Sequence, residues 1–263
     1  MRYLCADIGN THVKLGFYVD GKLSCQASFL LSDAVPACEW IGANAMDADG
    51  AILAASGAVP ERLEQAVRSS AARYERLTAD TPIPIENRYR TPRTLGPDRL
   101  AAAVGAYAGH GGQPLLVVDA GTAITFDTVT ASGAYLGGTI SPGLQMRFEA
   151  LHHYAERLPL VTPGEQEGLV GRTTAEAIAL GVQNGILAEI DYYVREFGSI
   201  FGKPTVVLTG GDMIFLMNRL KNTAKYIIFA ERDLVLDGLH SIIRGIVSPE
   251  GEKQGNVNIN QIP

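Results

Sequence analysis

The most regular hydrophobic pattern in the 263-residue chain is an apolar run, a short polar turn and a second apolar segment, and it occurs twice. In LLVVDAGTAITFDTV, residues 115–129, the apolar run ends at Asp119, and β-branched or aromatic residues follow the turn. Such a run bounded by turn residues is typical of a buried strand. In YLCADIGNTHVKLGFYV, residues 3–19, the same order recurs around Asp7. We therefore predict two strand–turn–strand units.

The two units align at one offset, which indicates an internal duplication. Asp7 and Asp119 are 112 residues apart, and the same offset aligns the glycine two positions after each aspartate. A single repeat of domain length implies duplication of a whole unit rather than an array of short repeats. Two turns of this kind can face one another across a cleft, which is the arrangement that phosphoryl transfer needs.

Further patterns predict the remaining elements of an α/β fold with mixed sheets flanked by helices. Thr173 and Glu176 match a capping box at the start of a long helix. We expect domains at 1–113 and 114–263, with 248–263 as a flexible tail. The predicted strands lie near 21–29, 51–55, 135–140, 205–208 and 226–229, the helices near 35–45, 60–74, 97–108, 144–157, 174–197 and 234–246 with one more after 212, and an extended loop at 81–94.

Composition restricts the class of protein. A formal net charge of −6 argues against nucleic acid as a main partner, because phosphate backbones require clustered Lys and Arg. Three cysteines without a CxxC pair favour free thiols in a reducing compartment. Asp7 comes too early for the apolar core of a signal peptide, and no run approaches the roughly 18 apolar residues that span a bilayer. We expect a cytoplasmic protein with no membrane contact.

Two common phosphate-binding motifs are absent from the sequence. Gly202-Lys203 continues with Pro204 rather than completing GxxxxGK[ST], and no GxGxxG opens a predicted helix. A P-loop and a dinucleotide-binding loop therefore lack their phosphate-binding segments. The adjacent pair His152-His153 cannot point in one direction on a helix, which disfavours a metal site there.

Asp98 is the best catalytic candidate. It lies at the start of a predicted helix, where the helix dipole favours an ionised carboxylate. Such a group can orient an alcohol for attack on a γ-phosphoryl group, and Gly96 permits close approach of a ligand. Arg99 can bind a substrate carboxylate or the charge that develops during transfer. The alternative is that Pro97-Asp98 simply starts a helix well.

Other polar turns leave two interpretations open. The turn at Asp119, Gly121 and Thr122 can hold a cation or a polar ligand, since Gly admits close backbone contacts and Thr adds a hydroxyl. The same residue types also form ordinary turns. The turn 209–212 (TGGD) suits contact with a nucleotide or a plain connection from strand to helix. Thr174 is equally ambiguous, because its neighbour already explains a helix cap.

Six segments in order resemble the type III pantothenate kinases, members of the acetate and sugar kinase/Hsc70/actin superfamily. They are DIGNTHVKLG, GPDRLAAAVGAYA, DAGTAITFDTV, GGTISPGLQMRFEAL, GRTTAEAIALGV and TGGD. The resemblance runs from Asp7 to about Asp212 and implies two duplicated RNase H-like domains. It also implies ATP-dependent phosphorylation of pantothenate to 4′-phosphopantothenate, the first step towards coenzyme A.

The resemblance further implies a set of site residues, a cation and a homodimer. Asp98 would accept the proton, Asp119 would bind a monovalent cation (K⁺ or NH₄⁺), and Mg²⁺ would accompany ATP. From the residues alone, Asp119 suits Mg²⁺ as well as K⁺. Substrate would bind near the subunit interface of a homodimer. The residues implied for ATP are Asp7, Ile8, Gly9, Asn10, Thr11, His12, Val13, Lys14 and Thr122, and those for pantothenate are Tyr89, Gly96, Pro97, Asp98, Arg99 and Thr174.

Two other functions compete with the kinase. A phosphohydrolase of the same superfamily would leave Tyr89 and 96–99 without a purpose. A non-catalytic accessory or assembly protein is the third possibility, and the intact Asp98-Arg99 pair argues against it.

Overall fold

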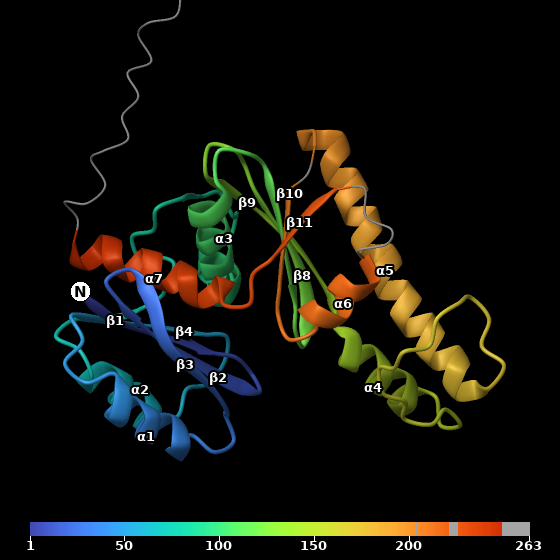
Figure 1. Cartoon of the computed structure of the whole chain (residues 1–263), viewed down its shortest axis with the longest axis horizontal. Coiled ribbons are helices and arrows are strands. Elements are labelled where there is room, and N and C mark those ends of the chain that lie inside the picture. Colours follow the sequence, from blue (N-terminus) through green and yellow to red (C-terminus); the bar gives the residue numbers. More distant parts are fainter. Residues whose placement is uncertain (204, 221–225, 249–263) are drawn as a thin grey trace, which may run out of the picture. The chain divides into compact units, whose positions relative to one another are not determined.

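The computed structural model describes residues 1–203, 205–220 and 226–248, and the chain divides into two compact units. Unit 1 comprises residues 1–86, 91–108 and the segment from Val235 onward. Unit 2 comprises residues 87–90 and 109–234. Each unit contains one mixed sheet with helices packed against it (Figure 1). This agrees with the predicted α/β fold.

Unit 1 is built on a five-stranded sheet in the order β3-β2-β1-β4-β5. The strands β3, β2 and β1 are antiparallel neighbours, whereas β1, β4 and β5 are parallel. The elements assigned wholly or mostly to unit 1 are β1 (Arg2–Ile8), β2 (His12–Val19), β3 (Lys22–Leu30), α1 (Val35–Asn44), β4 (Gly50–Ala55), α2 (Glu61–Ser69), β5 (Tyr74–Arg76), a 3₁₀ turn (Pro92–Thr94), α3 (Pro97–His110) and α7 (Leu234–Val247).

Unit 2 repeats this strand order. Its sheet runs β11-β10-β7-β8-β9-β6, so that β9-β8-β7-β10-β11 matches β3-β2-β1-β4-β5 in both order and direction. The predicted duplication is confirmed by this topology. The elements are β7 (Leu115–Ala120), β8 (Ala123–Val129), β9 (Ala134–Pro142), α4 (Leu144–Tyr154), α5 (Thr174–Phe201), β10 (Thr205–Thr209), α6 (Met213–Leu220) and β11 (Ile227–Ala230), with β6 (Glu86–Asn87) at the edge.

Alternation along the strands divides the sheet of unit 1 into two faces. Leu4, Ala6 and Ile8 of β1 pack into the same buried cluster as residues of α1 and α2. Tyr3, on the other face, contacts the ring of His240 in α7. Because successive strand residues point to opposite faces, the two sets of helices cover the two sides of the sheet (Figure 1).

The helix α7 joins unit 1 through close contacts with α3 and the sheet. A Cβ atom at Gly238 would lie 1.8 Å from the carbonyl oxygen of Ala101, so the two helices touch there through backbone atoms. The His240 ring stacks on Tyr18 at 4.2 Å between centroids, and the Tyr18 hydroxyl donates to Asp237 at 2.6 Å. Burial lowers the pKa of His240 to about 4. The ring is therefore neutral at pH 7 and packs as an aromatic group.

The unit 1 helix predicted over 60–74 is shorter than expected. It ends at Ser69, and Tyr74 instead begins β5 beside β4. The spacing of Leu63, Val67, Ala71 and Tyr74 suggested one long helix. However, the Ser69 hydroxyl donates to the Gln65 carbonyl and the Ser70 hydroxyl donates to the Val67 carbonyl. Such side-chain bonds compete with the backbone N–H groups that would continue the helix.

The other predicted elements are found with changes at their ends. The helix α5 extends to Phe201, and α4 stops at Tyr154 rather than near 157. The predicted cap at Thr173 is formed, since the Glu176 backbone N–H donates to the Thr173 hydroxyl at 3.2 Å. The Glu176 carboxylate accepts the N–H of Arg172 at 2.7 Å, one residue before the position that a capping box uses. The segment 81–94 is mostly extended, with β6 and the short 3₁₀ turn in it.

The two units differ from the expected domains in two respects, of which the first is that residues 87–90 belong to unit 2. The division between units at 108/109 falls close to the expected boundary at 113/114. The C-terminal helix α7, however, lies in unit 1, although its sequence follows unit 2. Of the predicted tail 248–263, residues 249–263 lie outside the described part of the chain.

Two properties expected from composition concern thiols and membrane spans. Cys5 is buried, Cys25 and Cys38 are half-buried, and all three are free thiols as predicted. Within residues 1–203, 205–220 and 226–248, none of the helices is long and apolar enough to cross a membrane.

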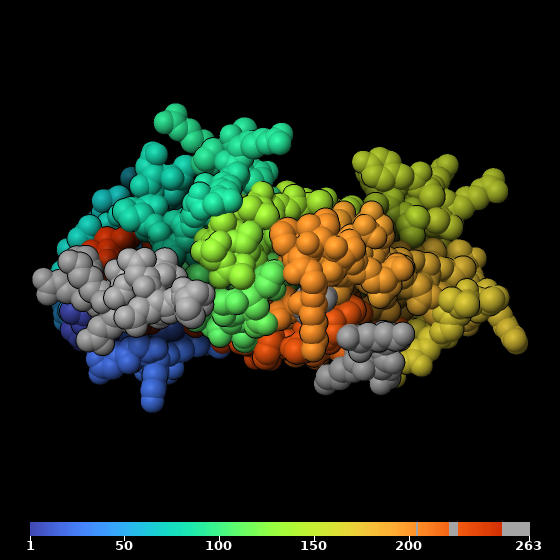
Figure 2. Space-filling model, turned by 90° about the horizontal axis from the view of Figure 1, so that it is seen from above, coloured from blue at the N-terminus to red at the C-terminus, as the bar shows by residue number. Residues whose placement is uncertain are grey.

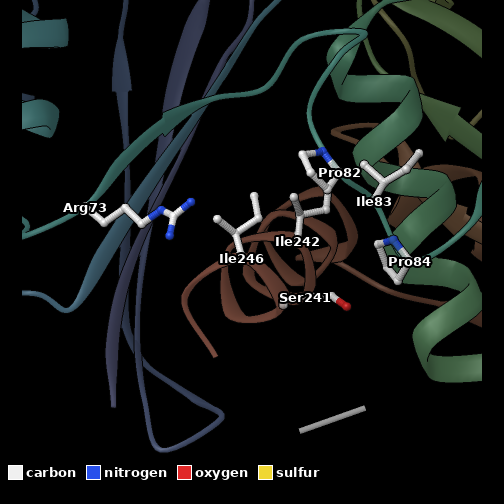
Figure 3. Close-up of a pocket in the computed structure, with 8 residues that line it drawn as sticks. Arg73, Pro82, Ile83, Pro84, Ser241, Ile242 and Ile246 are labelled. Carbon is white, nitrogen blue, oxygen red and sulfur yellow. The ribbon is translucent and has the colours of Figure 1, made fainter. Parts of the chain in front are cut away.

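A cavity of about 320 Å³ lies between α7 and the segment Pro82–Pro84 of unit 1 (Figure 3). Figure 3 shows the side chains of Ile242 and Ile246 directed toward Pro82, with the Arg73 guanidinium near Ile246. Gly245 also lines this cavity, and a Cβ atom there would meet no atom within 4 Å. None of the predicted site residues lines it.

The two glycines of α7 give a matched test of how this helix packs against α3. We expect Gly245→Ala to stabilise the protein by about 0.5–1 kcal/mol, since alanine is the better helix former and the space is open. Gly238→Ala should instead destabilise it by more than about 1 kcal/mol, because the new Cβ collides with the Ala101 carbonyl. Urea unfolding of both variants measures the difference. Equal effects at the two positions would contradict the α3–α7 contact.

Candidate functional site

The first polar turn connects β1 and β2 in unit 1. Ile8 pairs with Val13 across the hairpin, so residues 9–12 form the turn, and the Gly9 N–H donates to the His12 carbonyl at 2.9 Å. Asn10, Thr11 and His12 are exposed, whereas Ile8 and Val13 are fully buried in the core. Within this predicted ATP segment, Ile8 and Val13 can therefore offer a ligand only their backbone.

A second turn lies beside this hairpin at the carboxyl end of β4. Because β4 is parallel to β1, both strands end at the same edge of the sheet. The Ser56 N–H donates to the Ile8 carbonyl at 3.1 Å, and a Cβ at Gly57 would lie 3.1 Å from Asn10 Oδ1. The sequence predicted a strand near 51–55 and no functional role for the Ser56-Gly57 turn that follows it. Its position beside the first turn depends on the parallel pairing of β1 and β4.

Asp98 lies in the first turn of α3, as predicted, and is half-buried. Its Oδ1 atom accepts a hydrogen bond from the Arg99 backbone N–H at 2.9 Å. A Cβ at Gly96 would lie only 2.5 Å from that oxygen. A side chain at 96 would therefore displace the Asp98 carboxylate, which is a more specific reason for glycine than ligand approach. Arg99 itself is buried, with 8% of its surface exposed.

The second polar turn connects β7 and β8 in unit 2. Ala120 pairs with Ile124, so residues 121–123 form the turn, one residue fewer than in the first hairpin. The Gly121 N–H donates to the Ala123 carbonyl at 3.0 Å, which repeats the bond from Gly9 to His12. At the offset of 112 residues Thr11 falls one position after Thr122, and the extra residue in the first turn explains this shift.

Two further segments pack directly on the Asp119 turn. Gly210 has φ +94°, and a Cβ there would lie 2.3 Å from the Ala120 carbonyl oxygen and 2.5 Å from Asp119 Oδ1. The Asp212 N–H donates to the same Ala120 carbonyl at 2.9 Å. Gly143 approaches from α4, since its N–H donates to the Thr122 carbonyl at 3.1 Å. The turns at 121–123, 143 and 210–212 thus form one cluster around Asp119.

Asp212 is the second carboxylate of this cluster. Burial raises its pKa, and a hydrogen bond from the backbone of Leu144 opposes that shift. Leu144 begins α4, where backbone N–H groups lack partners within the helix. The carboxylate of Asp212 thereby connects the 210–212 turn to the start of α4. The sequence offered Asp212 only as part of an ambiguous turn.

Tyr89 belongs to unit 2, and its ring packs against the strand β9. A Cβ at Gly137, which has φ +104°, would lie 2.9 Å from Tyr89 Cδ2, so the ring rests against the Gly137 backbone. Its ring centroid is 6.3 Å from that of Tyr135. The Tyr135 hydroxyl donates to the buried Asp127 at 2.7 Å. Sequence reasoning did not identify Tyr135 or Asp127.

Thr174 lies at the start of α5 and lines a mostly apolar groove of about 690 Å³ between α4 and α5. The polar side of this groove includes Arg147, which forms an ion pair with Glu189 and donates to the Ser141 hydroxyl at 3.1 Å. Figure 2 shows α4, in olive green, projecting beside the yellow segment that leads into α5. The groove is lined by Pro142, Arg147, Ala150, Leu151, Leu158, Thr174, Ala177, Ile178, Gly181 and Val182.

The predicted site residues thus form several local groups. In unit 1 the residues 7–14 lie at the β1–β2 turn, and 96–99 form the start of α3. In unit 2 Asp119 and Thr122 share one cluster, whereas Tyr89 packs against β9 and Thr174 lines the groove. Across the described residues, no three His, Cys, Asp or Glu side chains gather as a metal site would require. A Mg²⁺ ion carried by nucleotide phosphates needs only one or two protein carboxylates.

Two solved bacterial structures have the same fold as this chain. A Campylobacter jejuni protein assigned to the Baf family of transcriptional activators aligns with a TM-score of 0.62 at 22% identity, over 92% of this chain and 98% of its own. A Sinorhizobium meliloti protein assigned as a 2-dehydro-3-deoxygalactonokinase aligns with a TM-score of 0.58 at 14% identity, over 93% and 99%. These likenesses, at low identity, establish the sugar-kinase type of fold.

Sequence comparison identifies the family. The family model described as type III pantothenate kinase matches residues 3–196. A type III pantothenate kinase from Porphyromonas gingivalis is 39% identical over 236 residues, which cover 85% of this chain and 95% of that relative. The matched region includes both polar turns, the start of α3 and most of α5. The chain belongs to the type III pantothenate kinase family.

Proposed function

We propose that this protein transfers the γ-phosphoryl group of ATP to the primary hydroxyl of pantothenate, which gives 4′-phosphopantothenate and ADP. This reaction is the first step of coenzyme A biosynthesis. The observation that carries the proposal is membership of the type III pantothenate kinase family over most of the chain. The half-buried Asp98, oriented at the start of α3, supplies the group that such a transfer needs.

Asp98 is the proposed proton acceptor. One carboxylate oxygen accepts the Arg99 N–H, and the carboxylate can also accept the hydroxyl of the substrate. The alcohol oxygen then attacks the γ-phosphorus as the bond to ADP breaks. In a loose transition state the proton leaves the alcohol late, so an ordinary carboxylate suffices as its acceptor. Gly96 supports this role, because any side chain there would displace the carboxylate.

The two polar turns are the proposed contacts for ATP and its cations. We assign the segment 7–14 to the phosphates, with exposed polar groups at Asn10 and Thr11, and Thr122 to the nucleotide. Asp119 is the proposed ligand of K⁺ or NH₄⁺. The carboxylate and the carbonyls of the neighbouring turns are oxygen donors, which suit such a cation. Mg²⁺ would neutralise phosphate charge during transfer.

Pantothenate is assigned to Tyr89, to 96–99 and to Thr174. Tyr89 is half-buried and presents an aromatic ring, and Thr174 offers a hydroxyl in the α4–α5 groove. The Arg99 guanidinium would bind the substrate carboxylate or the charge that develops during transfer.

A homodimer is proposed from the apolar surface around this groove. Tyr154 at the end of α4 is 85% exposed, and Leu169 in the following loop is 90% exposed. Exposed apolar residues beside an apolar groove are typical of an interaction surface. Because Thr174 lines the same groove, a substrate residue would lie at the subunit interface. We further propose a cytoplasmic location, for which the free cysteines provide support.

The activity is tested with purified protein, ATP, Mg²⁺, K⁺ and pantothenate. We expect ADP and phosphopantothenate in equal amounts, and little ADP when pantothenate is omitted. Hydrolysis of ATP at the same rate without pantothenate would instead favour a phosphohydrolase. Neither product nor hydrolysis would favour a non-catalytic accessory protein.

Replacement of the proposed proton acceptor tests the chemistry. Asp98→Asn should lower turnover at least about 100-fold, because a positioned base is lost while the shape is kept. The KM for ATP should stay near the wild-type value. A near-normal turnover in the coupled assay would remove Asp98 from this role.

Exchange of the monovalent cation tests the assignment of Asp119. Turnover should fall when Na⁺ replaces K⁺, because the smaller ion fits poorly in a site sized for K⁺. In Asp119→Asn the difference between the two salts should disappear. Equal wild-type rates in matched concentrations of KCl and NaCl would exclude a K⁺-selective site.

A charge placed in the groove tests the homodimer. Leu151 lines the groove and is 37% exposed, so Leu151→Glu should convert the dimer to a monomer without unfolding unit 2. Ile214 on α6 is 55% exposed and does not line the groove, so Ile214→Glu is the matched control. Sedimentation velocity at micromolar concentration gives the answer. A monomeric wild-type protein would refute the dimer, and an unchanged Leu151→Glu dimer would refute this interface.

A further inference from the structure

We propose that the buried pair Asp127–Tyr135 is a positioning pair that holds Tyr89 for binding of pantothenate. The inference rests on the proposed function, because Tyr89 is assigned to pantothenate there. All three residues belong to unit 2. Asp127 lies on β8, Tyr135 lies on β9, and Tyr89 lies beside β9. Neither Asp127 nor Tyr135 touches substrate in this proposal. They act through the Tyr89 ring.

The segment that carries Tyr89 is attached to β9 at the level of Tyr135. The Arg88 N–H donates to the Tyr135 carbonyl at 2.9 Å, and the Tyr89 N–H donates to Asn87 Oδ1 at 3.0 Å. These bonds fix the backbone on the N-terminal side of the Tyr89 side chain. The ring position then depends on what the ring contacts along β9.

Two consecutive glycines of β9 shape those contacts. A Cβ at Gly137 would lie 2.9 Å from Tyr89 Cδ2, so only glycine lets the ring lie against the strand there. A Cβ at Gly138 would lie 1.9 Å from the Phe126 carbonyl oxygen and 2.7 Å from Asp127 Oδ1. One glycine therefore accommodates the Tyr89 ring, and the next accommodates the Asp127 carboxylate.

The Asp127 carboxylate fixes the Tyr135 ring by its hydroxyl. Asp127 is 1% exposed and Tyr135 is fully buried, and their hydrogen bond is 2.7 Å long. A buried carboxylate is costly unless it is hydrogen-bonded, so this pair is held together strongly. The Tyr135 and Tyr89 rings lie 6.3 Å apart at 43°, which is a normal aromatic contact. A continuous series of contacts thus runs from Asp127 to Tyr89.

The exposure of the three side chains indicates that Tyr89 can contact a ligand, whereas Asp127 and Tyr135 can only position Tyr89. Tyr89 is half-buried, whereas the other two are inaccessible to a ligand. A pair that only stabilised the core would affect unfolding and leave substrate affinity unchanged. A pair that positions Tyr89 should affect the KM for pantothenate and leave the KM for ATP unchanged.

Removal of one hydroxyl tests this distinction. Tyr135→Phe should raise the KM for pantothenate by up to about tenfold, because the free energy that one buried hydrogen bond contributes limits how far its loss can weaken the placement of Tyr89. The KM for ATP should stay within about twofold. Asp127→Asn keeps an oxygen acceptor for the Tyr135 hydroxyl, and its effect on the pantothenate KM should be smaller. Tyr193, whose ring stacks on Phe126 at 4.2 Å, supplies the matched control Tyr193→Phe, which should leave both KM values unchanged.

A double-mutant cycle identifies the route of the effect. If Tyr135 acts through Tyr89, the Tyr135→Phe change in KM should vanish in a Tyr89→Ala background. An unchanged effect in that background would overturn the proposal. So would a lowered melting temperature with a wild-type pantothenate KM in Tyr135→Phe. If Tyr135→Phe does not fold, Asp127→Asn takes its place in the same cycle.

The wild-type protein separates failure of this inference from failure of the proposed function. Absence of pantothenate-dependent ADP formation in the wild type would refute the function itself. A wild-type enzyme with normal activity and variants without a KM effect would refute only the positioning pair.

Discussion

The arrangement of the interior strands β1 and β7 is the constraint on which the candidate site depends. β1 and β7 each have an antiparallel neighbour on one side and a parallel neighbour on the other. The antiparallel neighbour requires a tight turn after the strand, and the parallel neighbour ends at the same edge. A polar turn and a second, glycine-containing turn therefore meet in both units. Ligands of open α/β sheets bind at such carboxyl-terminal edges.

Glycines let backbone segments pack closely against the acidic side chains of the candidate site. Gly210 brings its turn against Asp119, and Gly96 leaves space for the Asp98 carboxylate. A side chain at either position would collide with the carboxylate that the site uses. The glycines are thus part of how the acidic groups are oriented, although none of them carries a functional group. Gly137 has the same relation to Tyr89.

Local patterns predicted much of the fold, and contacts distant in sequence account for what was missed. Both hairpins, their duplication and the cap at Thr173 follow from short-range patterns, and the structure confirms them. The end of α2 was misplaced because β5 pairs with β4, which the helical spacing could not reveal. The place of α7 in unit 1 and the Asp127–Tyr135 bond likewise depend on tertiary packing. The identity of the substrate came from family resemblance, since no residue pattern distinguishes pantothenate from another alcohol.

The central claim is that Asp98 accepts the proton of the pantothenate hydroxyl. A crystal structure of the protein with pantothenate and a non-hydrolysable ATP analogue tests it most directly. We expect an Asp98 carboxylate oxygen within hydrogen-bond distance, roughly 2.6–3.2 Å, of the primary hydroxyl of pantothenate. A hydroxyl that faces a different base, or that lies well beyond this distance with the γ-phosphate in line, would contradict the claim.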